Sequence, residues 1–105
     1  MNKLEHLLVC VAEECAEVQQ AVTKMLRFGW DDINPSNGRT ALGHCRLEIA
    51  DLLAVLEMLK EAEHGYDFAV GKYTEHMKAK KQRVEGFMAY ARKRGTLKDS
   101  SCPQP

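Results

Sequence analysis

The feature that most constrains the fold is an apolar stripe in the first quarter of the chain. Apolar residues recur there at spacings of three and four, which is the period of one face of an α-helix. The stripe consists of Leu4, Leu7, Leu8, Val11, Cys15, Val18, Val22, Met25 and Leu26. It predicts one long amphipathic helix over residues 3–28, and Gly29 is its expected C-terminal stop.

Two further helices are predicted downstream. The segment 29–38, GWDDINPSNG, is dense in loop-forming residues and reads as a loop. A second helix over about 40–63 is apolar on more than one face, which is typical of a helix at the centre of a bundle. A short connector at 66–71 leads to a third helix over about 72–94, which is apolar on one side and rich in lysine and arginine on the other.

Length and patterning together predict one all-α domain over residues 1–95. It would be a helical bundle of two long antiparallel helices plus a third long basic helix. The remaining residues, 96–105, contain two prolines and little to bury, so they are predicted to be a disordered tail. Three helices from a 105-residue chain cannot cover an apolar second helix, so we expect the bundle to be completed by oligomerisation, as a homodimer or homotetramer.

Charge and hydropathy exclude several classes of protein. The formal net charge is zero, which argues against a strongly basic nucleic-acid binder. The charge is unevenly distributed, however: residues 1–65 are acidic and residues 66–105 are basic, an arrangement that suits metal ions on one side and a polyanion on the other. No apolar run approaches the ~20 residues of a membrane span, and the N-terminus lacks a signal-peptide core. We therefore expect a cytoplasmic protein without a membrane partner and without disulfides.

Two acidic motifs stand out within the predicted helices. The first helix contains Glu13 and Glu14 followed by Glu17, an EExxE string, and the second contains Glu48 and Asp51, an ExxD string. Residues three apart share a helix face, and both pairs lie beside the apolar stripe rather than opposite it. If the two helices pack antiparallel, four carboxylates converge at one rim, whereas Glu13 points nearly away from the stripe.

Four converging carboxylates repel one another unless a cation neutralises them. Oxygen-only ligand sets suit hard divalent cations such as Mg²⁺, and the absence of a His/Cys set argues against zinc. Either motif alone is better explained as solvated helix surface. The matched pair on two mostly apolar helices favours a metal site formed by Glu14, Glu17, Glu48 and Asp51.

The spacing of these motifs, EExxE and then ExxD after a gap of 30 residues, resembles the MazG-like nucleotide pyrophosphohydrolases of the all-α NTP pyrophosphatase superfamily. The resemblance extends to the strings AEECAEVQQAVTKMLRFGWDD, RLEIADLLAVLEML and KKQRVEGFMAYAR, which together span most of residues 12–92. It implies an oligomeric helical fold whose two antiparallel helices bind Mg²⁺, with Mn²⁺ as a substitute. It also implies hydrolysis of the α–β bond of nucleoside triphosphates to a monophosphate and pyrophosphate.

Matching motif to motif, the resemblance assigns the metal ligands to Glu14, Glu17, Glu48 and Asp51. Glu14 or Glu17 would also orient or deprotonate the attacking water. Several relatives carry an asparagine on the last helix near the substrate, but this chain has no asparagine there and offers Lys78, Lys80, Lys81 and Arg83 instead.

Four other residues are candidates for substrate binding. Trp30 could stack on a nucleobase or cap the end of the bundle, and these two interpretations are evenly balanced. Arg27, with its neighbour Lys24, could reach phosphates or be a solvated face. Lys80 and Arg83 could neutralise a triphosphate or be ordinary wet surface.

Two functions from other classes stay open alongside hydrolysis. One is a nucleotide- or metal-binding regulator that uses the same scaffold but has weak or no turnover. The other is a helical protein that interacts with nucleic acid through its basic third helix, although the zero net charge makes nucleic acid an unlikely partner.

Overall fold

A computed structural model describes residues 1–62 and 73–98, and within these ranges it contains three α-helices and no strand. They are α1 (Lys3–Phe28), α2 (Ala41–Glu61) and α3 (Thr74–Arg94). The all-α prediction is confirmed, and each predicted helix is present with ends within two residues of those expected. Among the described residues, no helix is long and apolar enough to cross a membrane. The chain separates into two units, one holding α1 and α2 and the other holding α3, and each is described by itself.

Local sequence sets the ends of α1 and α2. Asn2 and Glu5 form a capping box at the start of α1, in which each side chain accepts a hydrogen bond from the other residue's backbone N–H. Gly29 ends the helix at φ 109°, a backbone conformation that only glycine adopts without strain, and the predicted stop is confirmed. The hydroxyl of Thr40 accepts a hydrogen bond from the backbone N–H of Gly43 and so caps the start of α2.

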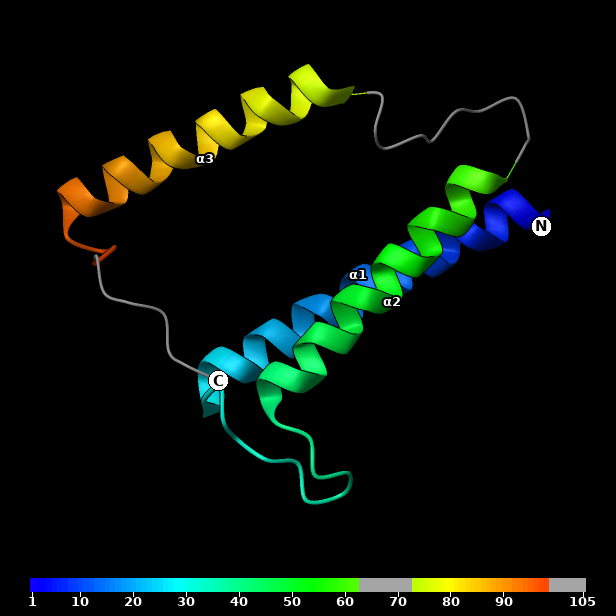
Figure 1. Ribbon diagram of the computed structural model, residues 1–105, viewed down its shortest axis with the longest axis horizontal. Helices are drawn as coiled ribbons and strands as arrows, with labels where there is room; N and C mark the ends of the chain where they lie inside the picture. Colours follow the sequence, from blue (N-terminus) through cyan, green and yellow to red (C-terminus); the bar gives the residue numbers. More distant parts are fainter. Residues whose placement is uncertain (63–72, 99–105) are drawn as a thin grey trace. The chain divides into compact units, whose positions relative to one another are not determined.

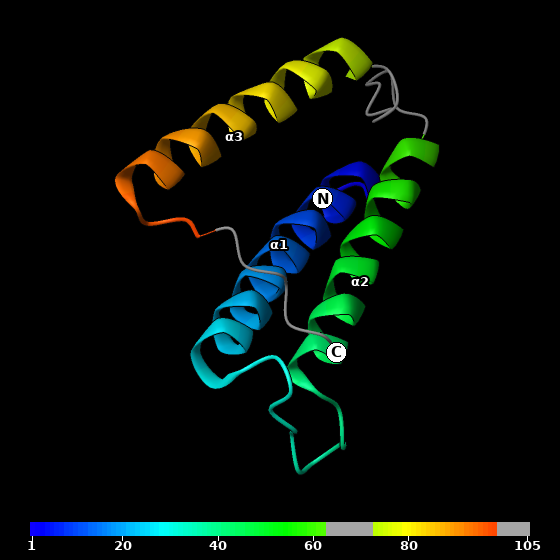
Figure 2. The ribbon, with the colours of Figure 1, turned by 60° about the vertical axis from the view of Figure 1, so that its left-hand side comes forward.

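The two helices of the first unit lie side by side and antiparallel (Figures 1 and 2). Two small apolar clusters join them, one at each end of the pair. At the N-terminal end of α1, Leu4 and Leu7 pack with Leu59 and Ala62. At the loop end, the buried side chains are Ala21, Met25 and Cys45, with Val22, Trp30, Ala41 and Leu42 packed against them. The apolar stripe of the first helix therefore forms the core only in part. Leu4, Leu7 and Met25 are buried as the spacing predicts, but Leu8, Cys15 and Leu26, which lie together along one edge of the stripe, are exposed.

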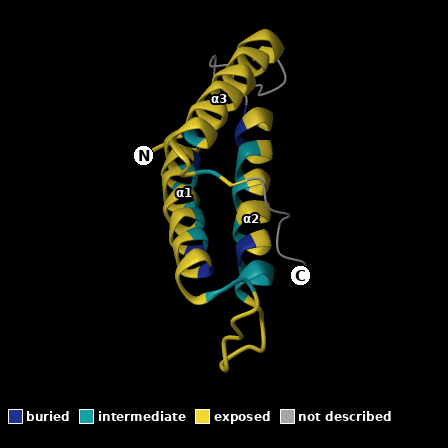
Figure 3. Ribbon diagram, turned by 90° about the vertical axis from the view of Figure 1, so that its left-hand side faces the viewer, coloured by how far each residue is buried: buried dark blue, intermediate teal, exposed yellow. Residues whose placement is uncertain are grey.

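The buried residues form a thin seam between α1 and α2, and most of the outer surface is exposed (Figure 3). Several large apolar side chains of α2 remain on that surface, including Leu47, Ile49, Leu53 and Met58. The prediction that the second helix is apolar on several faces is thus reproduced within the first unit. Oligomerisation, which would cover these side chains, stays a prediction.

The second unit is α3 with its C-terminal cap. The helix ends at Gly95, in the left-handed conformation, where the backbone N–H groups of Gly95 and Thr96 donate to the carbonyls of Arg92 and Ala91. Helix α3 has no buried residue in this structure. The cap orders residues 96–97 against the helix end, whereas the predicted tail started at residue 96. The predicted connector at 66–71 and the rest of the tail, 99–105, lie outside the described residues.

Candidate metal centre

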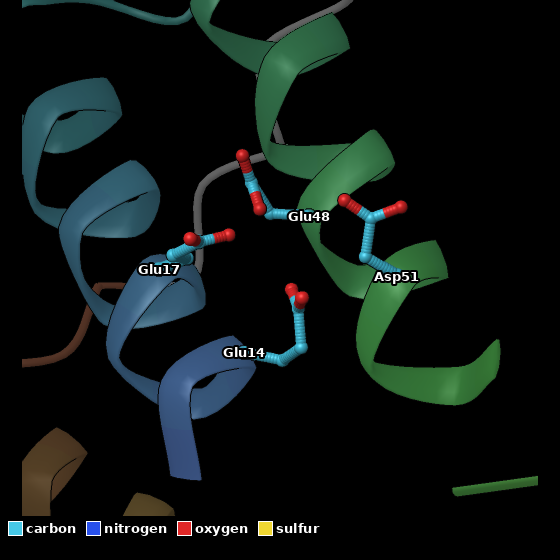
Figure 4. Close-up of side chains that lie close together, drawn as sticks. All are labelled: Glu14, Glu17, Glu48 and Asp51. Atoms are coloured by element: carbon cyan, nitrogen blue, oxygen red, sulfur yellow. The ribbon is translucent and has the colours of Figure 1, made fainter. Parts of the chain in front are cut away.

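The carboxylates of the two acidic motifs meet between α1 and α2. Glu14 and Glu17 project from one turn of α1, and Glu48 and Asp51 project from the facing turn of α2 (Figure 4). One oxygen from each of the four side chains lies within 4.8 Å of the others. One apolar cluster joins the two helices near the start of α1, and the other joins them near the loop. The acids lie between these two contacts, which together fix the register of the helices. The expected convergence of the four acids is therefore present in the geometry.

The four carboxylates differ in burial. Glu14 and Glu48 are half-buried, whereas Glu17 and Asp51 are exposed. The Oε2 atoms of Glu14 and Glu48 are buried and have no hydrogen-bond partner. A buried acceptor without a donor destabilises a folded protein, since it loses its hydration and gains nothing in exchange. These two oxygens therefore fit a site whose missing partner is a cation.

Burial and mutual repulsion also change the acidity of two of these groups. The pKa of Glu14 is raised, first by burial and then by the negative charges of Glu17, Asp51 and Glu48. The pKa of Glu48 is raised by burial and by its hydrogen bond and repulsion with Glu17, and His44 partly opposes this rise. A divalent cation would oppose both pKa rises, because its positive charge favours the ionised form of each carboxyl group.

Sequence analysis did not identify His44 as part of this site. Its Nε2 lies 3.4 Å from Oε1 of Glu48, one helical turn away on α2. The side chain of Glu48 is 15% exposed and that of His44 is 45% exposed, so the contact joins a largely buried carboxylate to a more exposed imidazole. The i, i+4 spacing of His44 and Glu48 was the available signal, since residues four apart on a helix are neighbours.

The donor set fits a hard cation. All four groups offer carboxylate oxygens, the ligands that Mg²⁺ and Mn²⁺ prefer in proteins. Glu13, the first residue of the EExxE string, is exposed and lies outside the cluster. Its exclusion agrees with the helical arithmetic that points it away from the apolar stripe.

The candidate substrate residues lie in different places. Trp30 is half-buried and packs against the apolar cluster at the loop end, the position expected of a bundle cap. The guanidinium carbon of Arg27 lies 5.5 Å from the ring centroid of Phe28. Lys80 and Arg83 line a shallow depression on α3 with His76, Met77 and Lys81. Because α3 belongs to the other unit, the roles of Lys80 and Arg83 toward the carboxylates stay predictions.

No protein-family model, curated protein or solved structure matches the chain. The chemistry of the site must therefore be inferred from its side chains and from the resemblance carried by the acidic motifs.

Proposed function

We propose that this protein is a Mg²⁺-dependent nucleoside triphosphate pyrophosphohydrolase. It would cleave the α–β phosphoanhydride bond of (d)NTPs and release a nucleoside monophosphate and pyrophosphate. The observation that supports this most strongly is the convergence of Glu14, Glu17, Glu48 and Asp51, whose ligand atoms lie within 4.8 Å of one another. The same four residues are those that the MazG-like resemblance assigns to metal binding.

In this proposal, the four carboxylates would hold the metal, and one of them would also accept a proton from the attacking water. Bound Mg²⁺ supplies the charge that neutralises the phosphates and lowers the pKa of the attacking water. Glu17 interacts with both Glu14 and Glu48 and is itself exposed, so it can accept the water's proton at its carboxylate. The water oxygen bonds to the α-phosphorus, the bond from that phosphorus to the bridging oxygen breaks, and pyrophosphate leaves with the electron pair.

The proposal includes assembly into a homodimer or homotetramer. In the described residues, the core of the α1–α2 pair contains no fully buried large side chain, and Leu53 and Met58 of α2 are at least half exposed. A second copy, or α3 of another copy, is the covering that a helical bundle needs. In such an assembly, Lys80 and Arg83 would supply positive charge for the leaving pyrophosphate.

The direct test is an assay of pyrophosphate release from a panel of NTPs and dNTPs, with Mg²⁺ or Mn²⁺. We expect turnover that requires the metal and yields monophosphate and pyrophosphate in equal amounts. Glu48→Gln should abolish most turnover, whereas Glu57→Gln, an exposed charge-matched change on the same helix, should not.

The alternatives give different results in the same set of experiments. Nucleotide binding without any hydrolysis would favour a regulator on this scaffold. Salt-sensitive DNA binding that is unaffected by Glu48→Gln would favour a nucleic-acid-interaction protein. The absence of turnover with every nucleotide tested would contradict the hydrolase proposal.

A further inference from the structure

A pocket of about 310 Å³ lies at the loop end of the α1–α2 pair. Its helical walls include Ala21, Lys24 and Phe28 from α1, and Ala41 and His44 from α2. Pockets of this size are in the range that holds small ligands. Neither the acidic motifs nor the resemblance indicated this pocket. Its position relative to the four carboxylates indicates what it could bind.

The pocket and the four acids share one face of each helix. At ~100° per residue, Glu14, Glu17, Lys24 and Phe28 fall within a sector of roughly 80° on α1. By the same arithmetic Asp51, Glu48, His44 and Ala41 fall within a sector of roughly 80° on α2. Because α1 and α2 are antiparallel (Figure 2), residues 24–28 of α1 and 41–44 of α2 lie on the loop side of the acids, and these stretches line the pocket.

The spacing along this face suits a nucleotide. With a rise of 1.5 Å per residue, Lys24 lies about 10 Å along α1 from Glu17, and His44 about 6 Å along α2 from Glu48. These two side chains line the pocket, and their helical positions put them on its side nearer the acids. Lys24 can donate hydrogen bonds to phosphate oxygens, whereas Nε2 of His44 already lies 3.4 Å from Oε1 of Glu48. This places a phosphate beside Lys24, between the pocket and the carboxylates.

The outer wall of the pocket is a loop whose backbone is extensively hydrogen-bonded. Ile33 and Thr40 form an isolated antiparallel bridge, and the N–H of Asn34 donates to the carbonyl of Arg39 at 2.9 Å. The side-chain oxygens of Asn34 and Asn37 accept from the backbone N–H groups of Ser36 and Arg39, both at 2.9 Å. These are Asx turns, so the side-chain oxygens of both asparagines stabilise the loop. The side-chain NH₂ groups of Asn34 and Asn37 take no part in those turns and remain hydrogen-bond donors.

The pocket offers both a stacking surface and polar groups. Phe28 lines the pocket and is 59% exposed, and the guanidinium of Arg27 lies over its ring. Asp32, Asn34, Asn37 and Arg39 add hydrogen-bond acceptors and donors to the lining. An exposed aromatic ring with nearby donors and acceptors is the combination that recognises a heterocyclic base, by stacking and by contact with its polar edge.

We propose that this pocket binds the base and sugar of a nucleotide, with Phe28 stacking on the base and the loop residues reading its edge. The phosphates would then pass Lys24 and His44 to reach the four carboxylates. The inference rests on the proposed function in one respect, because the carboxylates are taken to be the site of phosphate chemistry. It goes beyond that function by assigning base recognition to residues 28–40.

Binding of nucleoside monophosphates tests the pocket without any hydrolysis. Amide NMR spectra of the ¹⁵N-labelled protein in Mg²⁺ would be recorded with dAMP, dGMP, dCMP and dTMP, and with inorganic phosphate for comparison. We expect the monophosphates, but not phosphate, to shift the amides of residues 31–40. Phe28→Leu should weaken the tightest monophosphate roughly tenfold, because stacking on an aromatic ring is lost. Leu26→Ala, an equally exposed apolar change on the same turn of α1 and outside the pocket, should not weaken it.

Two results would overturn the pocket assignment. One is that monophosphates and phosphate shift the same amides and leave residues 31–40 unchanged. The other is that Phe28→Leu and Leu26→Ala weaken binding equally, which would indicate a general effect of apolar surface, such as contact with a second copy. Loop shifts without pyrophosphate release from any triphosphate would instead overturn the hydrolase proposal and support the nucleotide pocket.

Discussion

Replacing Asp51 with asparagine separates a metal ligand from an ordinary surface acid. The side chain is exposed, and its carboxylate lies within 4.8 Å of three others. Two unit charges at that distance repel by about 1 kcal/mol in a water-like dielectric. Asp51→Asn removes three such repulsions, so it should raise the melting temperature of the metal-free protein by at least the ~4–8 °C that 1 kcal/mol usually produces in a domain of this size.

The same substitution should have the opposite effect when magnesium is present. A neutral amide is a poorer ligand than a carboxylate for a hard cation, and even outer-shell partners of a metal cost ~10–100-fold in affinity when removed. The stabilisation of Asp51→Asn by Mg²⁺ should therefore be much smaller than that of the wild type, because binding stabilises by RT ln(1 + L/Kd), where L is the free Mg²⁺ concentration, and Kd is larger in the variant. Most turnover should also be lost.

The assay is a set of melting curves with and without Mg²⁺, for wild type, Asp51→Asn and Glu57→Gln, together with pyrophosphate release. Glu57→Gln removes one negative charge from an exposed position of the same helix outside the cluster, so it controls for net charge. If Asp51→Asn keeps both its Mg²⁺-dependent stabilisation and its activity, Asp51 is not a ligand. The case for the second motif would then largely disappear.

Three further predictions concern acidity, assembly and backbone conformation. The pKa values of Glu14 and Glu48 are raised, so the folded metal-free protein retains protons that the unfolded chain releases. Its melting temperature should therefore fall as the pH rises from below the ordinary carboxyl pKa through the raised values. The gain from Mg²⁺ should grow over the same pH range, and a pH-independent gain would contradict this. Sedimentation should give a multiple of 11.9 kDa, and Leu53→Asp should shift it toward the monomer; a wild-type monomer at micromolar concentration would rule the assembly out. Gly29→Ala should destabilise by about 1–3 kcal/mol because of its positive φ, whereas Gly86→Ala, at an open helix position, should not destabilise, as thermal melts would show.

The helices and the acidic cluster could be predicted because both depend on local periodicity. The spacing of Leu4, Leu7 and Met25 specifies which face of α1 is buried, and the same 3.6-residue period then fixes where Glu14 and Glu17 must lie. Antiparallel pairing was a condition of that prediction, and the structure fulfils it. With the buried faces and the direction of pairing known, the convergence of the four acids is a geometric consequence.

The pocket could not be predicted in the same way, whereas the contact of His44 with Glu48 follows helical spacing and could have been. The pocket depends on how the loop of residues 31–40 folds at the helix ends, and that fold rests on backbone hydrogen bonds and on two Asx turns with no periodic signal. The loop composition indicated turns but not which side chains would face inward. Trp30 illustrates the same limit, since either base stacking or helix capping suits a tryptophan in a loop, and only the packing places it against the apolar cluster.

The position of the acids between two apolar clusters explains how a two-helix unit can carry them. Four carboxylates within 4.8 Å repel one another, and two of their oxygens are buried without partners, so this stretch of the seam opposes pairing of the helices. The cluster around Leu7 and Leu59 and the one around Met25 and Cys45 favour pairing on either side of it. The apolar ends thus hold the helices together across a repulsive middle, which keeps the acids close before any cation arrives. A site preorganised in this way binds a cation more tightly, because the repulsion already present in the metal-free protein is relieved on binding.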